Sequence, residues 1–184
     1  MFWATGAALF IRADLFHKIG GFDGDYFAHM EEIDLCWRLK RAGYKVMIQP
    51  QSVVYHVGGG TLQYTSPRKT FLNFRNSYYT LLKNVTTQKL FWLLPLRLFL
   101  DAGAGLLFLS QGKLAHIAAI ARAHWTFFAQ FGTIRKKRKH DQELIDRISI
   151  HPHPNRTGIY AGSLVWQYYF LRKRVFRALL ANSK

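Results

Sequence analysis

The sequence of 184 residues contains a single cysteine, Cys36. One cysteine excludes an intramolecular disulfide and a zinc site built from several cysteines. Residues 1–20 also lack the basic start, the apolar stretch and the small-residue cleavage site of a secretory signal. We interpret the opening as the first core strand of a chain in a reducing compartment.

Acidic residues are scarce, because 10 Asp and Glu stand against 26 Lys and Arg, for a formal net charge of +16. Residues 1–60 hold equal numbers of each sign, so the excess of positive charge lies in residues 61–184. The hydrophobic content of 49% excludes a disordered or collagen-like chain. The second part is therefore suited to an anionic partner, such as lipid headgroups, diphosphate groups or nucleic acid.

The first 60 residues mix strand-like and helix-like patterns. Short apolar or β-branched runs at residues 6–11, 45–49 and 53–57 predict strands. A helical turn is expected through residues 15–19, stopped by Gly20 and Gly21. A longer helix is expected from about residue 26 to residue 42, ended by Gly43. The predicted fold class of this part is therefore α/β, with mixed strands and helices.

The pattern of the second part predicts helices at residues 69–83, 90–110 and 114–134. Residues 90–110 are long enough to cross a bilayer, but Pro95, Arg97 and Asp101 interrupt them, which favours an interfacial or re-entrant helical hairpin. The basic cluster 135–140 and the aromatic and basic residues of 158–180 suit an anionic membrane surface. We predict an α/β region at 1–61, a helical membrane-surface region at 62–140 and a basic, aromatic tail at 141–184.

The segment HMEEIDLCWR, residues 29–38, places three carboxylates near the start of a predicted helix. Helical spacing puts Glu32 on the apolar face, where partial desolvation would raise its pKa and suit it to act as a general base. Asp34 falls on the polar face, where Arg38 can form an i,i+4 ion pair. The alternative is that all three carboxylates only complement the helix dipole.

A longer segment, GAALFIRADLFHKIGGFDGDYFAHMEEIDLCWRLKRAGYKVMIQPQSVVYHVGGGT, resembles the acceptor-side, C-terminal half of family 2 glycosyltransferases of GT-A type, especially the rhamnosyltransferase-like group. The family shows, in the same order, a Gly-Ala strand, a Gly-Phe-Asp turn, an acidic helix start, a Gly-x-x-Val strand and a His before paired Gly. The resemblance covers residues 3–61, and more loosely the Arg-Asn and Lys-Asn pairs at 75–76 and 83–84.

The resemblance implies roles by position. Glu32 stands where the family has the Asp of the catalytic base, so this chain departs by one methylene, and Glu31 beside it is a second candidate. Asp34 and Arg38 match supporting positions. His56, Gly58 and Gly59 match the vicinity of the donor diphosphate and its metal, with His56 a candidate ligand, and Gly6 and Ala7 match the floor of the acceptor site.

The resemblance also implies a divalent cation, Mg²⁺ or Mn²⁺, in the intact enzyme. The family's main Asp-x-Asp metal motif precedes the acceptor half and is absent here, and we interpret Asp23 and Asp25 as turn residues. The pair of histidines in residues 151–156 is interpreted as part of a solvated linker. We therefore expect a fragment that lacks the donor-binding half and has little or no transfer activity alone.

The resulting hypothesis is an inverting glycosyltransferase of cell-surface polysaccharide synthesis at the cytoplasmic face of the membrane. Its partners would be a nucleotide sugar donor, a saccharide or polyprenyl-linked acceptor and the membrane surface. The alternatives are a basic nucleic-acid-binding module and a membrane-anchored interaction protein without catalysis. The apolar stretch 90–110 disfavours the first, and no nucleic acid is expected.

Overall fold

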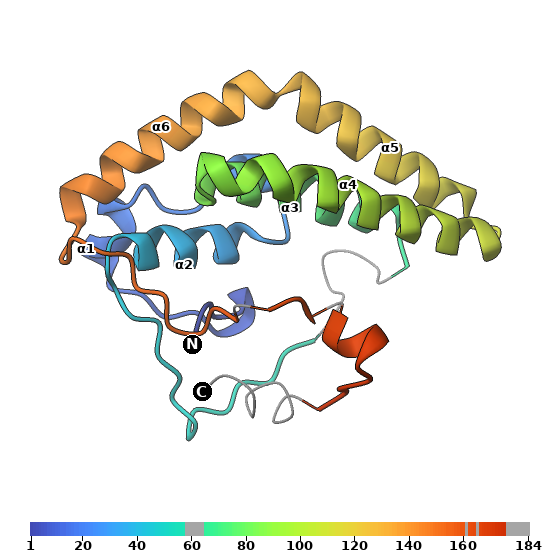
Figure 1. Cartoon of the computed structure of the whole chain (residues 1–184). Helices are drawn as coiled ribbons and strands as arrows, with labels where there is room; N and C mark the ends of the chain where they lie inside the picture. Colours follow the sequence, from blue (N-terminus) through green and yellow to red (C-terminus); the bar gives the residue numbers. More distant parts are fainter. Residues whose placement is uncertain (58–64, 161, 165, 176–184) are drawn as a thin grey trace.

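The computed structural model describes residues 1–57, 65–160, 162–164 and 166–175. Its elements are helices and short helical turns (Figure 1). The α-helices are α1 (Ala13–Lys18), α2 (Glu31–Arg41), α3 (Pro67–Asn84), α4 (Thr87–Ser110), α5 (Leu114–Ala129) and α6 (Phe131–Ile148). The turns are η1 (Gly6–Ala8), η2 (Gly24–Tyr26) and η3 (Trp166–Phe170), the last of which is π-helical.

The predicted α/β fold is wrong for the described part of the chain, which contains helices and no strand. Residues 6–8 form η1, and residues 45–49 and 53–57 have no regular structure. A strand needs a neighbouring strand for its backbone groups, whereas the Val46 carbonyl accepts from the Met1 ammonium group and the Gln49 carbonyl from Ser52 within a turn. Tyr55 and Val57 are correspondingly 95% and 85% exposed.

The helix stops in the first part were predicted correctly. Gly20 and Gly21, with φ of 85° and 62°, follow α1, and Gly43, with φ of 91°, follows α2. Left-handed φ values of this kind favour glycine, which has no Cβ to clash. The start of α2 was predicted too early, because residues 24–26 form η2 and α2 begins only at Glu31.

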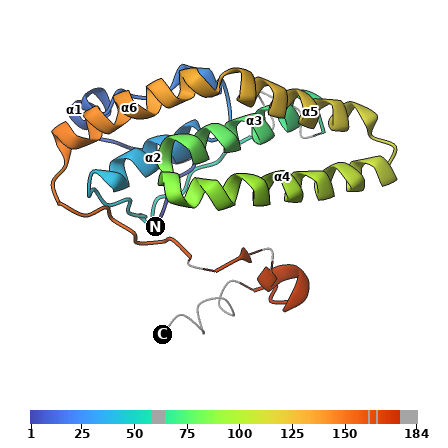
Figure 2. The same cartoon turned by 45° about the horizontal axis from the view of Figure 1, so that its top comes forward.

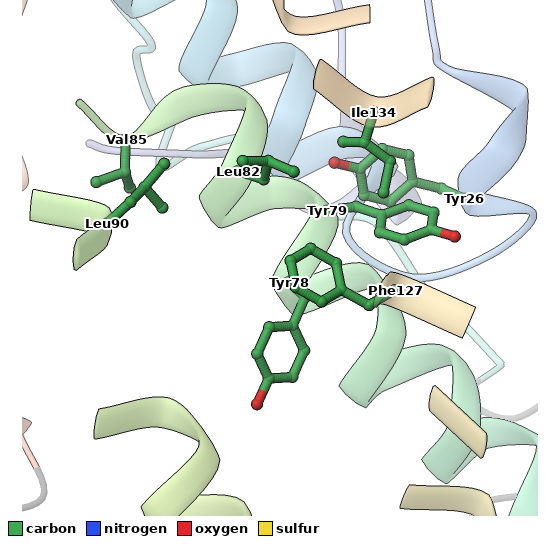
Figure 3. Close-up of a cluster of buried hydrophobic side chains, with 8 residues drawn as sticks. All are labelled: Tyr26, Tyr78, Tyr79, Leu82, Val85, Leu90, Phe127 and Ile134. Atoms are coloured by element: carbon green, nitrogen blue, oxygen red, sulfur yellow. The ribbon is translucent and has the colours of Figure 1, made fainter. Parts of the chain in front are cut away.

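Helix α3 lies at the centre and packs against α2, α4, α5 and α6. In Figures 1 and 2, α5 and α6 follow one another along one side of the molecule, and α2, α3 and α4 lie beneath them. The main core forms where α3 meets its neighbours (Figure 3), and burying each such side chain contributes roughly 1.5–3 kcal/mol. Its buried members are Tyr26, Tyr78, Tyr79, Leu82, Val85, Leu90, Phe127 and Ile134.

A second cluster joins α1, α2 and α6 around Leu15, Leu35 and Ile145. Helix α6 contributes through its apolar stripe and runs through residue 140, where the sequence predicted a boundary. The expected helix 114–134 divides at Gln130, so the basic cluster 135–140 lies inside α6. Lys137 and Arg138 of that cluster are half-buried and hydrogen-bonded to Asp23 and to the Leu82 carbonyl, so only part of the cluster is free to meet an anionic surface.

Helix α4 is continuous despite Pro95, and it forms a helical hairpin with α5 through the turn at residues 111–113. It is 24 residues long and is apolar enough to cross a membrane, by length and composition alone. Phe91, Trp92 and Phe99 are 72–75% exposed on it. Two of its charged residues pair toward the interior: Arg97 Nε lies 2.7 Å from Asp101, and Asp101 accepts from Tyr78 Oη at 2.8 Å, whereas Lys89 is exposed.

Candidate active site

The loop before α2 has an unusual backbone. Phe27, His29 and Met30 have φ of 63°, 70° and 74°, the left-handed region that non-glycine residues seldom adopt. Such conformations cost on the order of 1–3 kcal/mol each and persist only where surrounding contacts impose them. The loop leads directly into Glu31 and Glu32, so its strain fixes the direction in which α2 begins.

The contacts that impose this backbone come from α3. The buried Asn76 amide donates from Nδ2 to the carbonyls of Tyr26, Ala28 and His29, at 3.0, 2.8 and 2.8 Å. Arg75 donates to the Asp25 and Tyr26 carbonyls and also to Asn76 Oδ1 at 2.8 Å, which keeps Nδ2 directed at the loop. The Arg-Asn pair at 75–76 therefore serves to hold the loop 27–30.

Glu31 and Glu32 occupy the first turn of α2 and are half-buried. In each carboxylate Oε2 is buried and has no hydrogen-bond partner among the described residues. Burial raises the pKa of Glu32 and the charge of Glu31 adds to this, while the backbone amide groups of Glu32 itself, Gly6 and Met30 oppose it. A partly desolvated carboxylate with an unused oxygen can accept a proton from a bound hydroxyl.

The predicted floor residues lie on η1. The backbone amide of Gly6 is close enough to the Glu32 carboxylate to oppose the rise of its pKa, so the structure brings Gly6 and Glu32 together. Gly6 itself is exposed, and a Cβ added to it would meet no atom within 4 Å. Ala7 is half-buried, and its amide donates to Thr5 Oγ1 at 3.5 Å.

His29 is a candidate residue that the sequence analysis did not single out. Its Nε2 is buried without a hydrogen-bond partner in the described part of the chain. Burial lowers the pKa of His29, and the charge of Lys69 lowers it further, so the imidazole is held toward its neutral form. A histidine two positions before a pair of glutamates was the signal that could have found it, because such spacing places a second titratable group at the same helix start.

Asp34 and Arg38 form the predicted i,i+4 ion pair, with Arg38 Nε 2.9 Å from Asp34 Oδ2. The expected polar face is wrong, because Asp34 is fully buried beneath α3. Lys83 Nζ lies 3.0 Å from its Oδ2, and Asn84 Nδ2 donates to Oδ1 at 2.8 Å. The Lys-Asn pair at 83–84 therefore fixes α2 on α3, and these residues support the site without lining it.

Asp23 and Asp25 are turn residues, as predicted. Asp23 caps η2 by accepting from the Asp25 amide, and it binds Lys83 at 2.8 Å and Lys137 at 2.6 Å. Burial of Asp23 opposes its ionisation, but the hydrogen bonds from Lys137 and Lys83 outweigh burial and lower its pKa to about 2. Lys137 also binds Asp25. Ammonium groups therefore occupy both carboxylates.

His56, Gly58 and Gly59 are the residues predicted near the donor diphosphate and its metal. His56 is exposed in the irregular segment 45–57, and no hydrogen bond or ion pair joins it to Glu31 or Glu32. Gly58 and Gly59 lie outside the described residues. Where the structure describes the chain, no group of three His, Cys, Asp or Glu side chains is placed to hold a metal ion.

Comparison with known proteins finds short similarities to two rhamnosyltransferases. A stretch of 54 residues is 41% identical to N-acetylglucosaminyl-diphospho-decaprenol L-rhamnosyltransferase of Mycobacterium tuberculosis, and covers 29% of this chain and 18% of that protein. The matched stretch is glycosyltransferase-like. A stretch of 54 residues is 37% identical to Rhamnosyltransferase WbbL of Escherichia coli, and covers 29% of this chain and 20% of that protein.

The match thus spans about a fifth of the length of these glycosyltransferases. No protein-family model matches the chain, and no solved structure matches it. The similarity to two rhamnosyltransferases supports a glycosyltransferase-like function for the segment.

Proposed function

We propose that this chain contributes the acceptor side of an inverting glycosyltransferase, with Glu32 as the general base. The observation that carries the proposal is the half-buried Glu32 carboxylate, whose raised pKa and unpartnered Oε2 accompany a short similarity to rhamnosyltransferases. The Arg75–Asn76 pair holds the loop 27–30, which leads into the helix turn that carries this carboxylate. Glu31 is the neighbouring candidate.

In the proposed reaction the acceptor hydroxyl oxygen bonds to the anomeric carbon of the donor sugar. The bond from that carbon to the diphosphate oxygen breaks, and the electron pair leaves with the nucleoside diphosphate. Glu32 receives the hydroxyl proton, which makes the oxygen more nucleophilic as the new bond forms. A single displacement of this kind inverts the configuration at the anomeric carbon.

The donor is proposed to be a UDP- or dTDP-linked sugar, and the acceptor a lipid-linked saccharide at the cytoplasmic face of the membrane. The exposed apolar face of α4 and the positive charge of residues 61–184 support a membrane surface as partner. The described residues do not fit a divalent-cation site, because lysines occupy Asp23 and Asp25 and His56 stands apart. The steps proposed for this chain therefore use its carboxylates alone.

The test is sugar transfer by membranes that carry the complete reading frame containing this chain. Labelled UDP- and dTDP-sugars are supplied with a lipid diphosphate-linked N-acetylglucosamine. Glu32→Gln should lower kcat by roughly 10²–10⁴-fold with little change in KM, and should remove the acid limb of the pH profile. That limb should lie above the usual pH for a glutamate, because the base works only when ionised and its pKa is raised.

Glu143→Gln is the matched control, since Glu143 is an exposed carboxylate on α6. It should leave kcat and the pH profile unchanged. Equal activity of Glu32→Gln and Glu143→Gln would overturn the proposal. So would the absence of transfer by membranes that carry the unmodified reading frame.

A further inference from the structure

A pocket of about 610 Å³ lies between the N-terminal halves of α3 and α5, beside Phe27 of the strained loop. Its walls combine arginines with aromatic, aliphatic and small residues, and they include no acidic side chain. The residues that line it are Phe27, Pro67, Arg68, Phe71, Leu72, Arg75, Ala115, Ala118, Ala119 and Arg122. Three positive charges thus share one pocket whose lining contains no negative charge.

Two of these arginines are available to a ligand. The Arg68 guanidinium lies 4.8 Å from the Phe27 ring centroid, and that of Arg122 lies 5.2 Å from the centroid of Phe71. No acidic side chain lines the pocket beside either of them. Stacking on a ring orients a guanidinium and leaves its edge free for the paired hydrogen bonds that phosphate oxygens accept.

Arg75 adds a third guanidinium and connects the pocket to the candidate active site. It stacks at 5.2 Å on Phe71, as Arg122 does, while its Nη2 holds the carbonyls of Asp25 and Tyr26. Phe27, which also lines the pocket, belongs to the loop that leads into Glu31 and Glu32. A ligand in this pocket would therefore lie against the segment that positions the proposed base.

The remaining wall of the pocket is apolar and is formed largely by small side chains. Ala115, Ala118 and Ala119 give α5 only small side chains here, and the buried Leu72 of α3 lines the same pocket. Ala115 follows Leu114, which is 65% exposed, and the turn at 111–113 joins this end of α5 to the exposed Leu107 and Leu109 of α4. An apolar surface thus begins where the cationic pocket ends, an arrangement that fits an amphiphile.

We infer that this pocket binds the phosphoryl groups of a lipid diphosphate, with Arg68 and Arg122 contacting the phosphate oxygens and the lipid chain leaving along the α4–α5 end. Naming this ligand as the sugar acceptor rests on the proposed function. The phosphate recognition rests on the three arginines alone. A free nucleoside diphosphate shares the anionic group but has no chain for the apolar wall, and an anionic phospholipid offers a single phosphodiester.

The test measures binding by calorimetry with the full chain in uncharged detergent micelles. The probes are farnesyl diphosphate, farnesol, inorganic diphosphate, UDP and micelles that contain phosphatidylglycerol. Farnesyl diphosphate should bind at least tenfold more tightly than each other probe. The double variant Arg68→Ala/Arg122→Ala should weaken its binding by at least tenfold, because it removes both free guanidinium groups.

The matched control is Arg135→Ala/Lys136→Ala, which removes the same charge from exposed positions on α6. It should weaken binding less than threefold. Arg68→Lys/Arg122→Lys keeps the charge and removes the planar fork, and an intermediate loss is expected. Far-ultraviolet circular dichroism checks that each variant retains its helices, which is expected because Arg68 and Arg122 are exposed.

Equal losses of farnesyl diphosphate affinity in the two alanine variants would overturn the assignment of the binding site to this pocket, since nonspecific charge would then explain binding. Tighter binding of UDP would reassign the pocket to a nucleotide, and tighter binding of phosphatidylglycerol to a lipid headgroup; either result overturns the inference. The assay involves no sugar transfer. Arginine-dependent binding of farnesyl diphosphate with no effect of Glu32→Gln on transfer would therefore retain the pocket and overturn only the proposed base.

Discussion

The α2–α3 interface and the segment 45–57 lie close together in the sequence but differ in how they are held. At the interface, Lys83 and Asn84 of α3 bind the buried Asp34, and Asn76 binds three carbonyls of the preceding loop. Segment 45–57 carries Val53 and Tyr55 at 72% and 95% exposure. The difference is that polar contacts from a distant helix accompany regular structure at the interface, whereas the apolar side chains of segment 45–57 stay exposed on an irregular backbone.

The largest effect is expected where the interface is most tightly paired. Lys83→Met removes the ammonium group that lies 2.8–3.1 Å from Asp23, Asp34 and Asp141. Because these carboxylates would stay buried without their shared cation, the free energy of unfolding should fall by about 3–5 kcal/mol. Urea titration followed by circular dichroism measures this.

Lys89→Met is the control, because Lys89 is exposed near the start of α4. It should change stability by less than about 0.5 kcal/mol. Comparable losses in the two variants would show that the buried cation has no special part in joining α2, α3 and α6.

A smaller effect, with a defined pH dependence, is expected at Asp23. Hydrogen bonds from Lys137 and Lys83 hold its pKa at about 2 in the folded chain, below the ordinary 3.8. The folded state therefore gains stability above the ordinary pKa and loses it as pH falls from there through about 2. The shift corresponds to about 2 kcal/mol at neutral pH.

Asp23→Asn should accordingly destabilise the chain by about that amount at pH 7 and flatten the acid limb of the stability profile. Asp14→Asn removes the same charge from an exposed pair with Arg12 and should leave the acid limb near that of the unmodified chain. The measurement is the urea midpoint of each variant between pH 7 and pH 2. Identical profiles for the two variants would contradict the assignment of the acid limb to the lowered pKa of Asp23.

The features that local sequence determines were predicted from it. Gly20, Gly21 and Gly43 end their helices because the required φ is local, and Asp34 pairs with Arg38 because helical spacing places them together. The burial of Asp34 could not be predicted, because it depends on Lys83 and Asn84, whose positions are set by the packing of α3. His29 was missed for a similar reason, since its burial arises in the loop that Asn76 holds.

The strands illustrate the opposite case. The apolar, β-branched run at residues 53–57 forms a strand only if a neighbouring strand accepts its hydrogen bonds. The described chain supplies none, so the pattern predicted a local preference that no tertiary contact completes. The pocket of Arg68, Arg75 and Arg122 was beyond the sequence as well, because α3 and α5 meet there only after folding.

The smallest effect is expected in segment 45–57. Tyr55→Ser removes a side chain that is 95% exposed, so the free energy of unfolding should change by less than about 0.5 kcal/mol. Tyr79→Ser makes the same change at a side chain only 2% exposed in the main core and should cost about 3–5 kcal/mol. Urea titration of the two variants under one set of conditions gives the two losses in free energy of unfolding for direct comparison. If Tyr55→Ser proved as destabilising as Tyr79→Ser, the segment would be packed in solution and the contrast between the two regions would fail.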